Sequence, residues 1–169
     1  MRWIWIDRIV ELEKNLRCKA IKNISLSEDV LHDHFEGFEG GKSQPVLPNS
    51  LVIEGMAQTA GILVGHANDF REKVALAKIG KATFDGVAGP GQTLVYEATL
   101  ERIDGAGAST SGVVQLIDSA TGESREFGRI DLMFSHLDQN MSGLSFPEHN
   151  FVFSGQIMNL LEQSGFDKA

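Results

Sequence analysis

A glycine-containing apolar segment near the middle of the chain, residues 45–70, constrains the fold more than any other part of the sequence. Its interior, residues 51–64, leaves almost no polar face, and a helix that is apolar all round is buried rather than laid on a surface. Asn49 or Ser50 can cap this helix at its start. The segment is too short and too glycine-broken to span a membrane well. The sequence therefore predicts one buried helix at the centre of the fold.

Three glycines and one carboxyl group distinguish this helix from an ordinary core helix. Gly55, Gly61 and Gly65 each weaken a helix by about 1 kcal/mol relative to alanine, so we expect neighbouring backbone to pack closely against them. Glu54 is the one ionisable side chain deep in the segment, and Gln58 lies one turn later, within hydrogen-bonding reach. A carboxyl group in such surroundings must be paired, protonated or functional. Glu54 is therefore a candidate functional residue.

Patterns rich in branched and aromatic residues surround the helix and indicate strands. Strands are expected over residues 3–12, 18–24, 75–84, 92–103, 108–118 and 125–136. A short helical turn is expected at residues 27–31 and a glycine-rich loop at residues 34–44. Antiparallel strands with one apolar face need a cover, and the central helix is the candidate. The sequence thus predicts an α+β fold in which a curved antiparallel sheet wraps around one helix.

The length of 169 residues predicts one domain with a sizeable core. We assign residues 1–138 to this domain and residues 139–169 to a C-terminal extension. The extension is expected to contain a short amphipathic helix that Ser154 caps and that stops near Gly165. This helix should pack on the same domain or on a partner subunit.

Composition narrows the classes of function. The net charge of −8 argues against nucleic acid and anionic membranes as partners, and no membrane insertion is expected. Cys18 is the only cysteine, which excludes an intrachain disulfide and a thiolate metal cluster. Residues 1–10 are too short an apolar run for a signal peptide, and charged residues interrupt them, so a cytoplasmic location is expected.

The loop before the helix carries histidine and acidic side chains. A metal site there would draw on His32, Asp33, His34, Glu36 and Glu39. Nothing in their spacing fixes a metal geometry, so a solvated acidic loop is favoured and no metal is predicted. Pro45 and Pro48 stiffen the connection to the helix, and the loop can bring His34 close to the helix start, where N–H groups are unpaired. A base, an acid and an oxyanion-stabilising end would then suit proton abstraction next to a carbonyl.

Three motifs in order carry a resemblance to a known family. They are His34-Phe35-x-Gly37, Pro45-Val46-Leu47-Pro48 and Glu54-x-x-Ala57-Gln58, with further similarity at Ile6-Asp7-Arg8 and Ile21-Lys22-Asn23. The combination resembles the 3-hydroxyacyl-[acyl-carrier-protein] dehydratases of the FabZ/FabA group. That resemblance implies the hotdog fold, in which a curved antiparallel sheet wraps around one long central helix. The chain departs from the family pattern at Glu36, at the longer connection over residues 38–44, and at Asn49, where the family has glycine.

The resemblance also implies roles for particular residues. His34 and Glu54 correspond to the family's catalytic pair, and Gln58 would orient the carboxyl group. Backbone N–H groups at Asn49, Ser50 and Leu51 would polarise the thioester carbonyl, while Phe35, Val46, Leu47 and Pro48 would line the substrate tunnel. The expected activity is dehydration of 3-hydroxyacyl thioesters to trans-2-enoyl thioesters in fatty acid biosynthesis, with no cofactor. Residues 38–44 are expected to form a flap over the entrance.

The expected partner is an acyl carrier protein with a phosphopantetheine-linked substrate. The family resemblance also implies a homodimer with active sites shared between subunits, and a trimer of dimers is left open. Two other functions remain: an acyl thioesterase of the hotdog fold, and a non-catalytic relative that binds acyl chains. A histidine–glutamate pair favours elimination over hydrolysis, because a hydrolase needs an activated water rather than a base at C2. The sequence does not locate the closed end of the tunnel and hence gives no acyl chain length.

Overall fold

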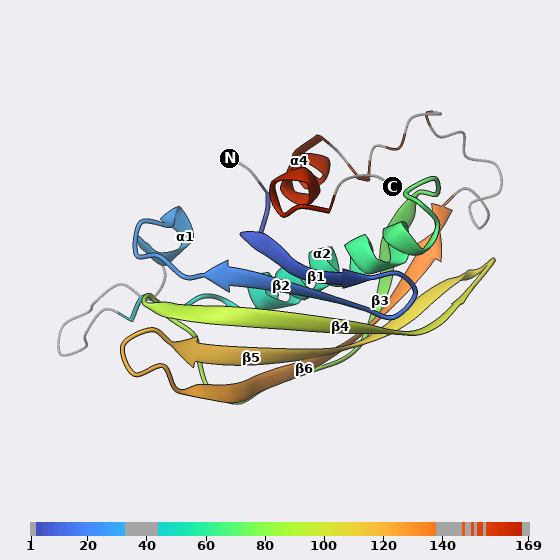
Figure 1. Ribbon diagram of the computed structural model, residues 1–169. Helices are drawn as coiled ribbons and strands as arrows, with labels where there is room; N and C mark the ends of the chain where they lie inside the picture. Colours follow the sequence, from blue (N-terminus) through green and yellow to red (C-terminus); the bar gives the residue numbers. More distant parts are fainter. Residues whose placement is uncertain are drawn as a thin grey trace.

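A computed structural model describes residues 3–32, 44–137, 147, 150, 152–153 and 155–166. The strands are β1 (Arg8–Glu13), β2 (Arg17–Asn23), β3 (Val74–Phe84), β4 (Gln92–Asp104), β5 (Gly107–Asp118) and β6 (Ser124–His136). The helices are α1 (Asp29–His32), α2 (Asn49–Ala67) and α4 (Gly155–Gln163). All strand pairs are antiparallel, in the order β1-β2-β4-β5-β6-β3, and the sheet curves around α2 (Figure 1). The predicted α+β hotdog architecture is therefore confirmed.

The ends of two elements differ from the sequence-based expectation. The first strand begins at Arg8, and residues 3–6 form no strand because their backbone bonds to α2 instead of to β2. The expected side-chain cap of α2 is wrong: Pro48 is the N-cap residue, with φ −58° and ψ 135°, and no side chain caps the helix. The proline ring fixes φ and positions the Pro48 carbonyl, which accepts the first N–H groups of the helix.

The glycines of α2 serve different purposes. A Cβ atom at Gly55 would lie 2.5 Å from the Tyr96 hydroxyl oxygen and 3.0 Å from the carbonyl oxygen of Trp5, so the predicted close backbone approach is confirmed there. At Gly65 the neighbours are the rings of Phe70 and Phe153 rather than backbone. The expectation is wrong for Gly61, where an added Cβ would meet, among the described residues, only a ring carbon of Phe134 at 3.8 Å.

Helix α2 is buried on most of its surface but not on all of it. Leu51, Val52, Met56, Ala60, Leu63 and Val64 are among its core residues. The prediction of burial on every side is wrong for one face, which holds the half-buried residues Ile53, Glu54, Ala57, Gln58 and Gly61. The sheet covers the other faces, whereas this face turns towards a groove.

The C-terminal segment packs on the hotdog core. Helix α4 lies over β1 (Figure 1), and its side chains Leu160 and Leu161 are buried. The Ile9 N–H donates to Ser164 Oγ at 3.1 Å, which ties the end of α4 to β1. Gly165, with φ +84°, follows the helix, in agreement with the predicted stop.

Candidate active site

The carboxyl group of Glu54 is held by two donors at one of its oxygens. Trp3 Nε1 donates to Glu54 Oε1 at 3.1 Å, and Gln58 Nε2 donates to the same atom at 2.9 Å. The hydrogen bond expected between Gln58 and Glu54 is thus present. Among the residues that the structure describes, none donates to Oε2. The two carboxyl oxygens therefore differ: Oε1 is fixed by two donors, whereas Oε2 lacks one within the described ranges.

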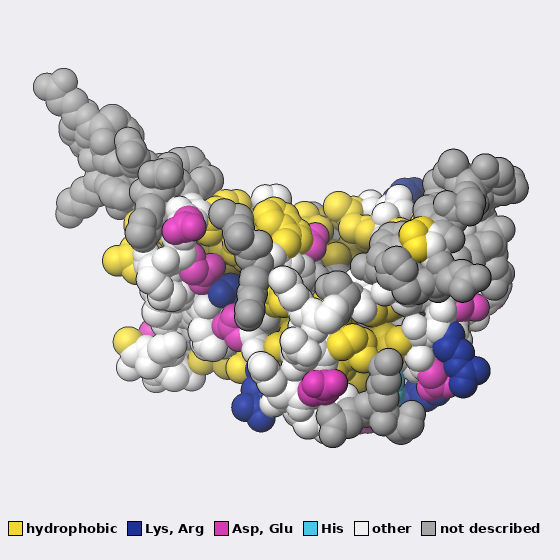
Figure 2. Space-filling model, turned by 90° about the horizontal axis from the view of Figure 1, so that it is seen from above, with side chains coloured by type: hydrophobic (Ala, Val, Ile, Leu, Met, Phe, Trp, Pro, Cys, Tyr) yellow, Lys and Arg dark blue, Asp and Glu magenta, His cyan; other side chains and the backbone are white. Residues whose placement is uncertain are grey.

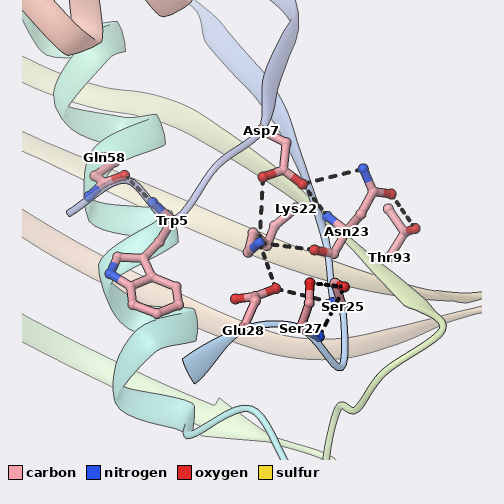
Figure 3. Close-up of polar contacts among 9 residues, drawn as sticks. All are labelled: Trp5, Asp7, Lys22, Asn23, Ser25, Ser27, Glu28, Gln58 and Thr93. Atoms are coloured by element: carbon pink, nitrogen blue, oxygen red, sulfur yellow. Dashed lines mark hydrogen bonds and ion pairs between the residues drawn. The ribbon is translucent and has the colours of Figure 1, made fainter. Parts of the chain in front are cut away.

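Gln58 also holds the N-terminal stretch against α2. Its Oε1 accepts the Trp5 N–H at 2.8 Å, as Figure 3 shows, and its Nε2 donates to the Trp3 carbonyl oxygen at 3.1 Å. These contacts use both ends of the amide, so its orientation is determined. The orientation of Glu54 consequently depends on residues 3–5 as well as on α2.

A groove of about 360 Å³ runs along the half-buried face of α2. Glu54, Gln58 and Trp3 form its polar end. The remaining walls are mostly apolar and come from α2, from β3 and β6, and from the C-terminal segment. Figure 2 views this side of the molecule and shows apolar side chains along its middle. A volume and lining of this kind are typical of small-molecule sites.

The start of α2 offers backbone donors, and the residues just before it lie outside the groove. The Leu51 N–H already donates to the Pro48 carbonyl at 2.9 Å, whereas those of Asn49 and Ser50 have no acceptor within the described parts of the chain. Asn49 has no positive φ. None of Val46, Leu47 and Pro48 lines the groove. Leu47 is a core residue, and its N–H bonds to the Ala88 carbonyl at 2.8 Å.

Several predicted site residues lie outside the described residues. These are His34 and Phe35, together with most of the predicted flap, of which only Gln44 is described. The structure does describe α1, which ends at His32, two residues before His34.

A buried charge network anchors the start of α1. Lys22 is only 7% exposed, and its Nζ lies 2.9 Å from Glu28 Oε1 and 3.5 Å from Asp7 Oδ1 (Figure 3). The other oxygen of Asp7 accepts the Asn23 N–H at 2.6 Å, and Glu28 Oε1 accepts the Ser25 N–H at 3.1 Å. This network fixes the chain just before α1 against β1 and β2. The segment leading to His34 therefore starts from a fixed point.

Other reactive chemistry finds little support in the described residues. Burial raises the pKa of the Cys18 thiol to about 12, which makes it a poor nucleophile. No group of three or more potential metal ligands occurs within the described ranges. Likewise, none of the described helices is apolar and long enough to cross a membrane.

Sequence reasoning missed two parts of the site. The sequence pattern places Trp3 in a strand, whereas the structure shows its contact with Glu54, which joins positions 51 residues apart. The C-terminal segment supplies Val152, Phe153 and Ile157 to the groove. The apolar residues of the extension indicated that it packs on something, but no local signal indicated where.

Comparison with known proteins identifies the family. Residues 3–122 match the FabA-like domain family. The chain is 32% identical to a 3-hydroxyacyl-[acyl-carrier-protein] dehydratase FabZ of Verminephrobacter eiseniae over 126 residues, which cover 72% of this chain and 80% of that protein. It is 35% identical to the FabZ of Caldanaerobacter subterraneus over 102 residues, 60% of this chain and 68% of that protein.

Solved structures share the fold at low sequence identity. A thioesterase family protein from Silicibacter pomeroyi superimposes with a TM-score of 0.59 at 13% identity, over 76% of this chain and 82% of that one. The dehydratase heterocomplex ApeI:P from Xenorhabdus doucetiae superimposes with a TM-score of 0.56 at 15% identity, over 75% of this chain and 93% of that one. Both hold the same sheet-and-helix arrangement, which supports the fold alone. The sequence match decides the family: this chain belongs to the FabA-like domain family.

Proposed function

We propose that His34 and Glu54 are the base and the acid with which this protein dehydrates 3-hydroxyacyl-[acyl-carrier-protein] thioesters to trans-2-enoyl thioesters. The relatives named above carry this activity in their names, and the reaction is a step of fatty acid biosynthesis. The observation that supports the roles best is the polar end of the groove. There, one oxygen of Glu54 has no partner among the described residues, and it lies next to mostly apolar walls that suit an acyl chain.

In the proposed reaction, neutral His34 removes a proton from C2 of the substrate. The electron pair of the C2–H bond forms the C2=C3 double bond as the C3–O bond breaks. Hydroxide is a poor leaving group, so Glu54 gives its proton from Oε2 to the departing oxygen, and water forms. Oε1 keeps its two donors, from Trp3 and Gln58, which stabilise the carboxylate that results. Solvent then returns the proton from His34 to Glu54.

The thioester carbonyl needs stabilisation while C2 loses its proton. The N–H groups of Asn49 and Ser50 are unpaired among the described residues and lie at the positive end of the α2 dipole. We assign them to the carbonyl oxygen, in the manner of an oxyanion hole. Leu51 is left out of this role, since its N–H is bonded to Pro48.

A product assay tests the function and separates it from the alternatives. The protein is incubated with a 3-hydroxyacyl carrier-protein thioester. Growth of enoyl-thioester absorbance supports dehydration, release of free thiol indicates a thioesterase, and the absence of both indicates a non-catalytic relative. Because a positioned acid or base contributes about 10²–10⁴-fold, His34→Ala and Glu54→Gln should each lose at least about 10²-fold in turnover while remaining folded. Near-normal turnover by either folded variant would defeat its assigned role.

The protein is proposed to act as a homodimer through the β3 edge of the sheet. The other edge, β1, is covered by α4, whereas β3 is an eleven-residue edge strand with mostly exposed side chains. Leu76 and Ile79 on it are 40% and 45% exposed. A long apolar edge is an aggregation hazard unless another chain covers it. Pairing two β3 strands about a two-fold axis would continue the sheet and place the two α2 helices side by side, so that His34 of one subunit meets Glu54 of the other.

A further inference from the structure

The groove beside α2 has a direction. Its polar end is the Glu54 carboxyl group with Trp3 and Gln58, and its other lining residues are apolar apart from Gly61 and Gln156. Ala57 and Gly61 form the floor along α2, where the small side chains leave room. A 3-hydroxyacyl thioester has the same polarity, with reacting carbons at one end and an alkyl tail at the other. The tail would therefore run along α2 from Glu54 towards the C-terminal end of the helix.

Phe153 lines the groove and lies at that far end, against the last turns of α2. This side chain is 7% exposed, and its ring lies against Gly65 in the last turns of α2, where an added Cβ would be 2.3 Å from Phe153 Cζ. The ring also packs edge-on against Phe70, with centroids 5.0 Å apart. A larger residue at Gly65 would displace it. Glycine at this position thus lets an aromatic ring from the C-terminal segment occupy the end of the groove.

Hydrogen bonds hold the Phe153 ring in place. Asn150 Nδ2 donates to the carbonyl oxygens of Phe70 at 3.0 Å and Glu72 at 2.9 Å. Asn150 Oδ1 accepts the N–H groups of Val152 at 3.1 Å and Phe153 at 3.4 Å. One asparagine side chain therefore joins the C-terminal segment to the turn that follows α2. The end of the groove is a fixed wall of the folded chain.

The length of the groove follows from helix geometry. Ile62 is the last α2 residue that lines it, eight residues beyond Glu54, which corresponds to about 12 Å along the axis. A carbon chain with bonds of about 1.5 Å advances about 1.25 Å per bond when extended, so this distance holds about ten bonds. We propose that Phe153 sets the chain length of the substrate by closing the groove about ten carbons beyond the reacting C3. This proposal rests on the proposed dehydration for the identity of the occupant.

A binding series tests the proposal independently of catalysis. Saturated acyl-pantetheine amides of six to eighteen carbons, which can be neither dehydrated nor hydrolysed as thioesters, are titrated into the protein by calorimetry. Each methylene that enters an apolar site improves affinity about fourfold. The affinity of the wild type should rise at this rate to about a dozen carbons and then level off. We call the chain length at which affinity levels off the break. In Phe153→Ala the break should move to chains at least two carbons longer. The first chain beyond the wild-type limit should then bind Phe153→Ala more than about tenfold tighter than it binds the wild type.

Two further variants complete the test. Phe127→Ala makes the same change at a buried residue of β6 that does not line the groove, and it should leave the break where it is. Phe153→Leu removes less volume and replaces Phe153→Ala if that variant does not fold. Its break should lie beyond that of the wild type and short of the one expected for Phe153→Ala. An unmoved break in the folded Phe153 variants would overturn the proposal. If the break moves but the protein dehydrates no 3-hydroxyacyl thioester, the role of Phe153 in setting chain length is supported. Only the proposed function is then refuted.

Discussion

The substitution Gly55→Ala tests the packing of α2 against the sheet. In an open helix this change stabilises, because alanine is favoured over glycine by about 1 kcal/mol. Here the new methyl group would lie 2.5 Å from the Tyr96 hydroxyl oxygen, 2.6 Å from Tyr96 Cζ and 3.0 Å from the Trp5 carbonyl oxygen. Tyr96 is fully buried, and the Trp5 oxygen belongs to the backbone, so neither can simply swing away.

The expected size follows from these two opposing terms. Overpacking a well-filled core costs about 1–3 kcal/mol, and contacts this short place Gly55→Ala near the upper limit. After the gain in helix propensity, the net loss is about 2 kcal/mol. In a chain of this size each kcal/mol shifts Tm by about 2–4 °C, so Tm should fall by about 4–8 °C.

Thermal unfolding at one protein concentration measures the effect, with Gly155→Ala as the matched control. Gly155 opens α4, and an added Cβ there meets no atom of the described residues within 4 Å. The Tm of Gly155→Ala should therefore stay the same or rise slightly. Tyr96→Phe removes a buried hydroxyl group that has no hydrogen-bond partner among the described residues, and it should recover part of the loss when combined with Gly55→Ala. A Gly55→Ala protein as stable as Gly155→Ala would refute the close packing of α2.

Two further predictions concern the site and pH. Trp3→Phe deletes the indole N–H bonded to Glu54 and should lower kcat about fivefold with little change in KM, a modest effect because Trp3 is 58% exposed. Trp5→Phe is its control, since the buried indole N–H of Trp5, at Nε1, has no partner within the described residues. Equal kcat in both variants would contradict the assignment. Burial lowers the pKa of His66 below its ordinary value of 6.5, so the unfolded chain binds more protons there and stability should fall as pH drops below about 6.5. Urea unfolding between pH 5 and 8 measures how the free energy of unfolding changes with pH. This change should be smaller in His66→Gln than in the wild type, and equal changes would contradict the role of His66.

The sheet and the central helix could be predicted from the sequence because their signals are local. Strand alternation and the apolar run of residues 51–64 need no knowledge of distant parts. The start of α2 differs from the expectation: Asn49 and Ser50 are good capping residues, yet Pro48 fixes the backbone and takes the N-cap position. Composition alone could not show that one face of α2 is only half-buried, since that depends on where the sheet ends.

The candidate site was predictable where motifs carry it and not where distant segments meet. Glu54 and Gln58 are one helical turn apart, so their hydrogen bond follows from the sequence. The contacts of Trp3 with Glu54, and of Phe153 with Gly65, join segments 51 and 88 residues apart. Such contacts depend on tertiary packing, for which a single sequence gives no register.

We propose that Glu54 is the acid of an active site completed by His34 of a partner subunit. The most direct test of this claim mixes two inactive variants, His34→Ala and Glu54→Gln, which are unfolded together and refolded. Random pairing makes about half the dimers mixed, each with one unmutated site of two, so dehydratase activity should recover to about a quarter of the wild-type level. Each variant refolded alone is the control and should stay inactive. If the mixture also stays inactive while its dimers form, both residues come from one subunit or do not act together, and the claim is wrong.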